Sequence, residues 1–508
     1  MLLGLLGCTQ TVKNNPVFKP TVEGAKPGTL YISEDYTKVW PQPAGEVGSP
    51  GHDLCWHLDN EHSQLKAARD LVMKRMKSEG IKPVRIMILD TGYDENYETL
   101  RADRPKEGRI HLNTRLARNF VKGENPGSAV ESSSGDHSGT FGHGTGTINI
   151  LAGPKVKVMK ETSAGYRQVH DDYLGAIPMA EIIPVRISKS VFLTKYAPMN
   201  ILFNTSHQNV ITEALHYAAD DLGDEAPDVI SMSMGSHPSD RLGKAVQHAY
   251  DSGIAMAFAA GNHLTTPVTP FNTPRQVVYP AGYPWAICVS GATHEDRTYG
   301  YTKGLFNNLS NLRDRDLYMR GNFGPYFHNK PTFENNVLSA YTPNIPWSEH
   351  SGGTEPKNPG EAFRDKLSLQ GGGTSSATPQ VAAALALWLQ YYRPELEEMK
   401  LWHKPKAVEM AYQALFQSAK KAGKEQGRKQ EPDYGETPYT TAYLGWGILQ
   451  AKDAIVKFPP KSFLKDNAKM LRTPLAIEKS DRISDRLFRL QWWVTSWWRM
   501  PPLRAFPK

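Results

Sequence analysis

Residues 84–92 read VRIMILDTG, an apolar run that ends in an acidic residue, a hydroxyl residue and a glycine. A run of this length and composition predicts a buried strand. In open sheets of parallel strands, functional side chains gather at the carboxyl ends of the strands. We therefore expect Asp90 to stand at the edge of a sheet where chemistry takes place.

Strands and helices alternate after this run. Strands are expected at 181–187, 228–235, 255–259 and 286–290, and helices at 64–78, 210–219, 242–251 and 379–392. The last of these helices is apolar nearly all round, which predicts that it is buried. Residues 294–370 show no clear periodicity and are interpreted as long surface loops with a few short strands. The alternation predicts an α/β fold with a mostly parallel sheet and helices on both faces.

The composition sets broad limits on the class of protein. A chain of 508 residues is long enough for two or three domains, or for one large α/β domain with extensions. The net charge of +7, from 59 basic and 52 acidic residues, is mild for this length, so no nucleic-acid partner is expected. No stretch of 18 apolar residues is present, and a membrane-spanning helix is therefore not expected.

Three cysteines are too few for a disulfide framework. Cys288 lies in an apolar, strand-like run and is expected to pack as a small buried hydrophobic residue. A single bridge between Cys8 and Cys55 stays open as an alternative.

Two further motifs carry reactive side chains beside glycines. Residues 142–147 read GHGTGT, and residues 371–379 read GGGTSSATP at the start of the expected buried helix. A serine at a helix start is commonly an N-cap, but the N–H groups there also stabilise an oxyanion when a hydroxyl attacks a carbonyl. Ser375 is therefore a candidate nucleophile, with Ser376 as the alternative. His143 is either a structural histidine or a general base that titrates near neutral pH.

Residues 259–262 read AAGN, where an apolar strand ends. Asn262 is either an ordinary turn residue or a side-chain donor to an oxyanion.

Taken in order, these motifs resemble the signatures of the subtilisin-like serine peptidases, the subtilases of peptidase family S8. An acid, a base and a serine follow one another here as they do in subtilisin. The resemblance spans roughly residues 84–456 and includes GAIPMA at 175–180, SMG at 233–235 and GWGILQA at 445–451. It implies the three-layer subtilisin-like α/β fold, with helices on both faces of a mostly parallel central sheet.

The resemblance also implies a serine endopeptidase that acts through an acyl-enzyme intermediate. Asp90 would orient His143, His143 would be the general base, and Ser375 would be the nucleophile. Asn262 would form the oxyanion hole with the backbone N–H of Ser375. An extended polypeptide substrate would pair with the chain as an added strand. The expected substrate-binding residues are Ser233, Met234, Gly235 and Gly261.

No cofactor is required for this chemistry. Many relatives bind calcium, yet no ligand cluster is recognisable here. No metal site is therefore assigned, and a structural calcium ion stays without named ligands.

Some positions depart from the family pattern. Gly146 stands where relatives usually have a second histidine, three residues after the base. Ser376 replaces a common methionine, Thr378 replaces a common serine, and YTPN at 341–344 replaces an Ala-Pro-Gly turn. These changes leave the triad intact and concern the shape and specificity of the cleft.

Two alternatives belong to other functional classes. Asp90-Thr91-Gly92 and Asp251-Ser252-Gly253 could be the halves of an aspartic peptidase, but Asp251 ends a helical run, and His143 would then have no role. The second alternative is a non-catalytic, subtilase-like peptide-binding protein.

The expected domain organisation has four parts. Residues 1–55 form an N-terminal lead or linker, 56–83 a helical lead-in, 84–457 the catalytic domain, and 458–508 a basic, Trp-rich extension. Residues 1–8 read MLLGLLGC and resemble the end of a lipoprotein signal, in which Cys8 would be lipidated. Because subtilases are mostly exported, an extracytoplasmic location, secreted or lipid-anchored, is expected. No oligomeric state is predicted.

The C-terminal segment 480–508 combines arginines with tryptophans at helical spacing. Such a helix either contacts a membrane surface or docks on the catalytic domain or a partner.

Overall fold

The structure is a computed structural model, and it describes most of the chain between residues 54 and 464. Cys8, Asn262 and residues 480–508 lie outside the described residues. The described residues are 28–32, 54–131, 142–162, 165–189, 191, 206–236, 238–261, 263–264, 277–292, 294, 296, 317–318, 336–342, 344–348, 367–421 and 444–464.

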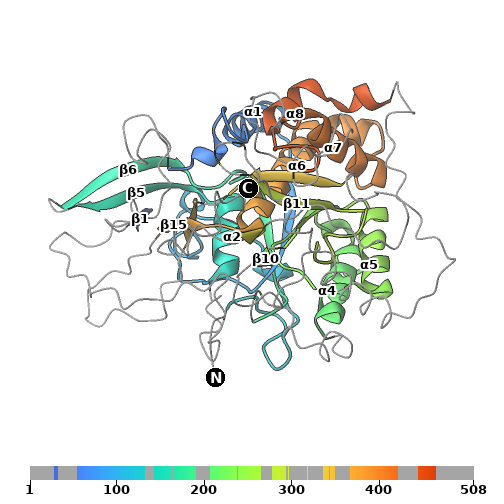
Figure 1. Cartoon of the computed structure of the whole chain (residues 1–508), viewed down its shortest axis with the longest axis horizontal. Helices are drawn as coiled ribbons and strands as arrows, with labels where there is room; N and C mark the ends of the chain where they lie inside the picture. Colours follow the sequence, from blue (N-terminus) through green and yellow to red (C-terminus); the bar gives the residue numbers. More distant parts are fainter. Residues whose placement is uncertain are drawn as a thin grey trace, which may run out of the picture.

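A central sheet of eight strands organises the described residues (Figure 1). Its order is β13-β11-β9-β8-β2-β7-β3, β4 also pairs with β7, and every pairing is parallel. The strands are β2 (Arg85–Asp90), β3 (His111–Leu112), β4 (Arg118–Asn119), β7 (Glu181–Arg186), β8 (Val229–Met232), β9 (Ala255–Ala259), β11 (Ile287–Ala292) and β13 (Val337–Tyr341). Parallel strands need crossover connections, and these place helices on the faces of the sheet.

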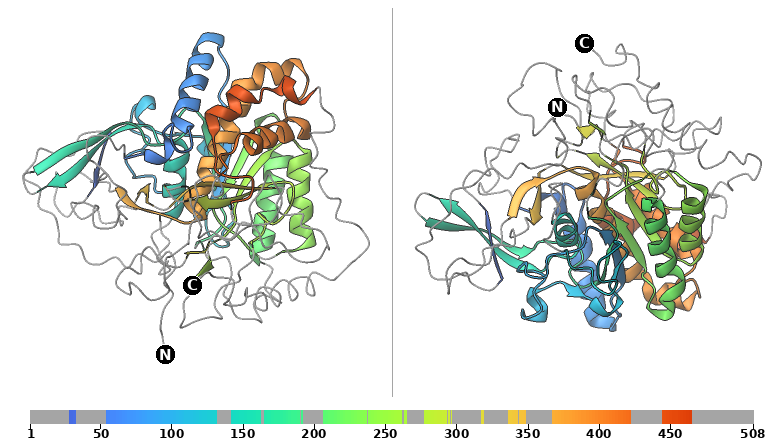
Figure 2. Two further views of the ribbon diagram at one scale, coloured as in Figure 1. Left: turned by 45° about the horizontal axis from the view of Figure 1, so that its top comes forward. Right: turned by 90° about the horizontal axis from the view of Figure 1, so that it is seen from below.

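Helices cover both faces, which confirms the predicted fold class. On one face, α6 packs on β8, β9, β11 and β13 and beside α2. Figures 1 and 2 show α4 and α5 on the face away from α6. The helices are α1 (Leu65–Glu79), α2 (His143–Ala152), α4 (Ser206–His216), α5 (Asp240–Asp251), α6 (Thr374–Glu398), α7 (Pro405–Ser418) and α8 (Ala451–Lys457), and α4 continues into a π-helical turn, η5 (Tyr217–Asp221).

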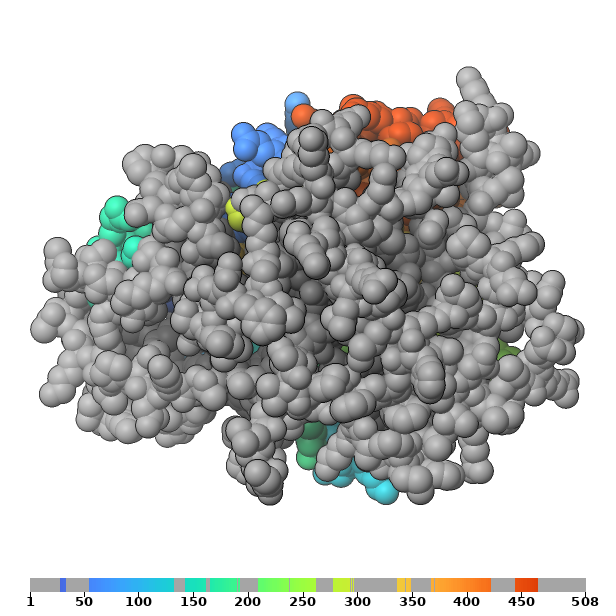
Figure 3. Space-filling view, viewed as in Figure 1, coloured from blue at the N-terminus to red at the C-terminus, as the bar shows by residue number. Residues whose placement is uncertain are grey.

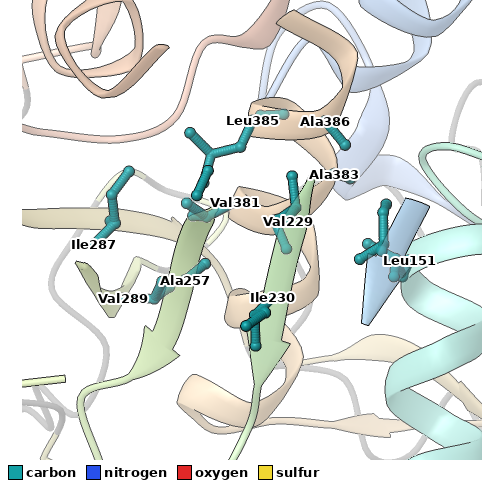
Figure 4. Packing of buried hydrophobic residues seen from close by; sticks show 14 of the residues in the cluster. Leu151, Val229, Ile230, Ala257, Ile287, Val289, Val381, Ala383, Leu385 and Ala386 are labelled. Atoms are coloured by element: carbon teal, nitrogen blue, oxygen red, sulfur yellow. The ribbon is translucent and has the colours of Figure 1, made fainter. Parts of the chain in front are cut away.

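The core forms where α6 meets the sheet. Val381 and Leu385 of α6 lie close to Val229, Ala257 and Ile287 of the strands (Figure 4), and all five side chains are fully buried. Burial of apolar area stabilises a fold by about 25 cal/mol for each Å², so the contact of α6 with the sheet contributes to the stability of the domain. The helical lead-in also joins this core, because α1 packs against α6 and α8. In the space-filling view, α1 and α8 come to the surface side by side at the top (Figure 3).

The buried helix is longer than the sequence pattern predicts. The expected helix at 379–392 is the middle of α6, which begins at Thr374 after Gly373 and contains Pro379 and Pro394. Proline removes one helical hydrogen bond and commonly ends a helix. Here both prolines lie inside a helix that tertiary packing holds together.

Several strands were not predicted individually from the sequence, among them β13, β1 (Thr29–Ile32), β5 (Lys155–Thr162) and β6 (Gly165–Tyr173). β13 lies within the residues interpreted as surface loops, yet it is a fully buried edge strand of the central sheet. β5 and β6 form a long hairpin that projects from the body in Figure 1, and β1 runs parallel to β5. The sequence does not indicate β6 as a strand, because it is largely polar and carries exposed residues along its length.

Two antiparallel pairs complete the described strands. β14 (Ile345–Ser348) pairs with β15 (Leu367–Gly371), which leads directly into α6. β10 (His263–Leu264) pairs with β12 (Leu317–Tyr318). None of the helices described here is both long enough and apolar enough to cross a membrane.

Cys288 lies in β11 as a fully buried residue, as predicted, and burial raises the pKa of its thiol far above the ordinary range. A thiol in this state is inert and serves only packing.

Candidate active site

Asp90 is the last residue of β2, and its buried carboxylate has three donors. Oδ1 accepts from the backbone N–H of Thr91 at 2.7 Å and faces Nδ1 of His143 at 2.7 Å. Oδ2 accepts from the hydroxyl of Thr147 at 3.1 Å. Because a carboxylate can only accept, Nδ1 of His143 carries the proton and Nε2 remains the basic nitrogen.

Glycines allow close contact between residues 90–92 and residues 142–147. A Cβ on Gly144 would lie 1.9 Å from the carbonyl oxygen of Gly92, so no side chain fits there. Gly92 itself has a φ of 105°, which L-residues rarely adopt. The hydroxyl of Thr91 accepts the N–H of Gly144 at 3.1 Å and ties β2 to the first turn of α2. This close approach brings His143, the first residue of α2, to Asp90.

Ser375 is the second residue of α6 and is bonded reciprocally to Ser233. Its hydroxyl donates to the Ser233 carbonyl at 3.2 Å, and the Ser233 hydroxyl donates to the Ser375 carbonyl at 2.9 Å. Pro379 explains the second bond, because it has no N–H to offer the carbonyl four residues earlier in the helix. Ser233 takes over as the donor and so fixes the start of α6 to the residues that follow β8.

Ser376 has a different environment. Its hydroxyl lies 3.0 Å from the Gly373 carbonyl and 3.0 Å from the hydroxyl of Thr342, and the residue is fully buried. Both contacts are internal to the protein. The hydroxyls of both serines thus bond within the protein, and Ser375 as the nucleophile stays a prediction from the sequence motif.

His143 and Ser375 stand on the first turns of two helices that pack side by side. Nε2 of His143 is buried and has no hydrogen-bond partner within the described part of the chain. The expected contact between the Asp90 carboxylate and the His143 imidazole is therefore formed. The expected contact between the imidazole and the Ser375 hydroxyl is not, because that hydroxyl is bonded to Ser233.

The expected substrate-binding residues lie around the same serine. Gly261 donates its N–H to the hydroxyl of Thr374, the neighbour of Ser375, at 3.2 Å. Met234 is buried, while Gly235 is partly exposed. Asn262 falls outside the described residues, although Gly261 beside it is described.

Trp347 of β14 occupies the position left by a missing side chain at Gly146. A Cβ on Gly146 would lie 2.3 Å from Cε2 of Trp347, so the indole packs directly on the backbone of α2. The indole ring centre also lies 5.4 Å from that of His143, at an interplanar angle of 58°. The departure at Gly146 was visible in the sequence, but its indole partner, about 200 positions away, was not.

Buried charged residues lie beside the Asp90 and His143 motifs, and sequence reasoning missed them. Arg186, at the end of β7, is 2% exposed and binds Glu124 through Nε at 2.8 Å. Burial alone would raise the pKa of Glu124, but hydrogen bonds from Arg186 and Asn119 lower it to about 2. An arginine at the end of an otherwise apolar strand was the available signal, because a buried charge needs a partner.

Glu131 is a second buried carboxyl group near Asp90. Its Oε2 accepts the N–H of Gly142 at 2.9 Å, and Arg186 stands 4.0 Å from its Oε1. Burial raises the pKa of Glu131 to about 7 despite the hydrogen bond from Gly142, and the charge of Asp90 adds to the rise. Nothing in the local sequence marked this residue.

The alternative pairing of two aspartates is not formed. Asp251 is the exposed last residue of α5, and Asp90 is bonded to His143. A shared proton between the two aspartates is therefore excluded.

Comparisons with known proteins identify a family whose model matches the chain and two solved structures to which it is similar. The sequence model of the subtilase family matches residues 82–435. No curated protein matches the sequence significantly. A serine-to-alanine mutant of the protease domain of PatA aligns with a TM-score of 0.43 and 17% identity, over 77% of this chain and 98% of that one. MycP1 from the ESX-1 type VII secretion system aligns with a TM-score of 0.46 and 16% identity, over 85% and 91% respectively.

Proposed function

The chain belongs to the subtilase family of serine peptidases, and from that premise we propose that it is an endopeptidase acting through Asp90, His143 and Ser375. The observation that carries the proposal is the 2.7 Å hydrogen bond between Asp90 Oδ1 and His143 Nδ1. It holds the imidazole in the tautomer that a general base requires, with Nε2 free to take a proton.

The proposed reaction starts with a rotation of the Ser375 side chain. The hydroxyl leaves the Ser233 carbonyl and turns towards Nε2 of His143. His143 then accepts the hydroxyl proton while Oγ attacks the peptide carbonyl, and Asp90 stays ionised and stabilises the imidazolium. His143 next gives that proton to the leaving amine, and a water molecule hydrolyses the acyl-enzyme by the same route.

The oxyanion of the tetrahedral intermediate needs its own donors. We assign the backbone N–H of Ser375, in the first turn of α6, and the side-chain amide of Asn262. N–H groups in the first turn of a helix have no partner within the helix and carry partial positive charge. Loss of one such donor typically costs about 3–4 kcal/mol of transition-state stabilisation. The polypeptide substrate would pair with residues 233–235, next to the nucleophile.

A serine-directed fluorophosphonate probe tests the proposal. The wild-type chain should hydrolyse casein, and Ser375 should form a phosphonate ester with the probe, with loss of HF and a gain of the probe mass less HF. Ser375→Ala should do neither. Ser376→Ala is the matched control, because it removes a neighbouring hydroxyl that bonds only within the protein; it should still be labelled.

Casein hydrolysis by Ser375→Ala at the wild-type rate, or a probe attached elsewhere, would contradict the assignment. A wild-type chain that binds peptides but takes up no probe would support the non-catalytic peptide-binding alternative instead.

A further inference from the structure

Two histidines and an aspartate meet on the surface of the helical layer formed by α4 and α5. Nδ1 of His216 lies 2.9 Å from Oδ2 of Asp220, and Nε2 of His248 lies 2.5 Å from Oδ1 of the same carboxylate. His216 ends α4 and Asp220 lies in the following π-helical turn, while His248 belongs to α5. Three side chains from two packed helices thus converge on one point.

This cluster is remote from the triad. α5 starts beyond the carboxyl end of β8 and ends at Asp251, just before β9 begins at Ala255. His248 therefore lies near the edge of the sheet where the strands start, whereas Asp90 and Ser375 lie near the edge where they end. Any role of the cluster is separate from peptide hydrolysis.

We propose that His216, Asp220 and His248 form a binding site for a divalent transition-metal ion of the zinc type. Two imidazole nitrogens and one carboxylate oxygen are a donor set that zinc commonly takes, with water completing a tetrahedron. Ligand atoms about 2.0–2.1 Å from such an ion lie roughly 3.3 Å from one another. The three ligand atoms here already lie within 4.8 Å of one another, so small side-chain rotations suffice.

Binding exchanges two hydrogen bonds for metal bonds. In the absence of a metal, each imidazole nitrogen that faces Asp220 donates a proton to it. On binding, the nitrogen that faces Asp220 gives up that proton, to the other nitrogen of the ring (Nε2 in His216, Nδ1 in His248) when that nitrogen is unprotonated and otherwise to water. The freed lone pairs and the Asp220 carboxylate then bind the ion.

A metal ion here would connect α4 to α5. Besides the contact of His248 with Asp220, a 3.1 Å hydrogen bond from Arg241 to Asn209 also links the two helices. All three ligands are exposed, so the ion would exchange with solvent and act on stability rather than on catalysis.

Zinc titration of the full chain tests the site. The chain carries Ser375→Ala to prevent self-digestion and is freed of metal with EDTA. Calorimetry with zinc chloride should show one equivalent that disappears, or binds at least about tenfold more weakly, in His216→Ala and in His248→Ala. Zinc should raise the Tm of the parent, and this rise should be lost in both variants. Magnesium chloride should have no such effect, because magnesium prefers oxygen ligands.

His403→Asn is the matched control. Nε2 of His403 lies 2.7 Å from Asp228, but no second histidine faces that pair among the described residues. This variant should keep the zinc equivalent and the Tm rise. If the parent binds no zinc, or if both cluster variants bind it as tightly as the parent, the proposal is wrong. Melting curves without zinc show that each variant is folded.

Discussion

Glu131 offers a sharp test of the electrostatics around the proposed catalytic residues. Its side chain is about 1% exposed, and it accepts the N–H of Gly142, the residue that precedes His143. Burial raises its pKa from 4.5 to about 7. Glu131→Gln keeps the shape and one acceptor oxygen, and it makes the group permanently neutral.

The size of the effect follows from the raised pKa of Glu131. A change from 4.5 to about 7 corresponds to about 3 kcal/mol, at about 1.4 kcal/mol for each tenfold change. The folded protein holds the proton more tightly than the unfolded chain does. The stabilisation is therefore complete below about pH 4.5 and is lost as the pH rises through about 7, because unfolding releases a proton in that window.

Urea unfolding, followed by circular dichroism in the Ser375→Ala background, measures the effect. At pH 8 the native carboxyl group of Glu131 is ionised at a cost, so Glu131→Gln should be more stable than its parent by up to about 3 kcal/mol. Between pH 4.5 and 7 the variant should show a flatter decline in stability than the parent. Near pH 4.5 the two should converge, because both carry a neutral group.

The control is Glu124→Gln, because Arg186 lies close to both Glu124 and Glu131. The pKa of Glu124 is lowered to about 2, so its ionised form stabilises the fold and its removal should destabilise the protein at pH 8. If Glu131→Gln is no more stable than the parent at pH 8, Glu131 is stabilised as an ion and the reasoning fails.

Three further predictions concern single contacts. Asp90→Asn should keep the fold but lower the rate of probe labelling by about 10⁴-fold, because a neutral amide neither fixes the imidazole tautomer nor stabilises the imidazolium; a labelling time course gives the rate, and an unchanged rate would exclude the triad. Gly146→Ala should destabilise the protein by about 1–3 kcal/mol, since the new methyl overlaps the indole of Trp347; Trp347→Leu in the same chain should restore part of the loss, and no restoration would place the strain elsewhere. Tyr412→Phe should cost about 1–3 kcal/mol in urea unfolding, because the N–H of Met256 bonds to that buried hydroxyl at 2.7 Å; a neutral result would mean that Met256 finds another acceptor.

The α/β class and the positions of the main elements could be predicted from the sequence, because they depend on local patterns. The apolar runs IMIL of β2, IIPV of β7 and AMAFA of β9 are continuous, since the interior of a strand buried on both faces is almost entirely hydrophobic. The helical spacing of α1 and α5 is equally local. β13 has no such pattern, because its burial depends on β11 beside it and on α6 above it.

The same division holds at the candidate site. Asp90, His143 and Ser375 could be named from the sequence, because each stands beside glycines that only a close backbone approach explains. The bond between the Ser375 hydroxyl and the Ser233 carbonyl needed the structure, because it joins segments that lie far apart in the sequence.

The positions of Glu131 and Trp347 beside the candidate site could not be predicted from the sequence. A carboxyl group acquires a raised pKa, and an indole acquires an imidazole neighbour, only when distant segments fold together. Local sequence determined which chemical groups this protein carries and on which elements they stand. Tertiary packing decided which groups lose water and meet one another, because burial and contact are properties of the folded chain.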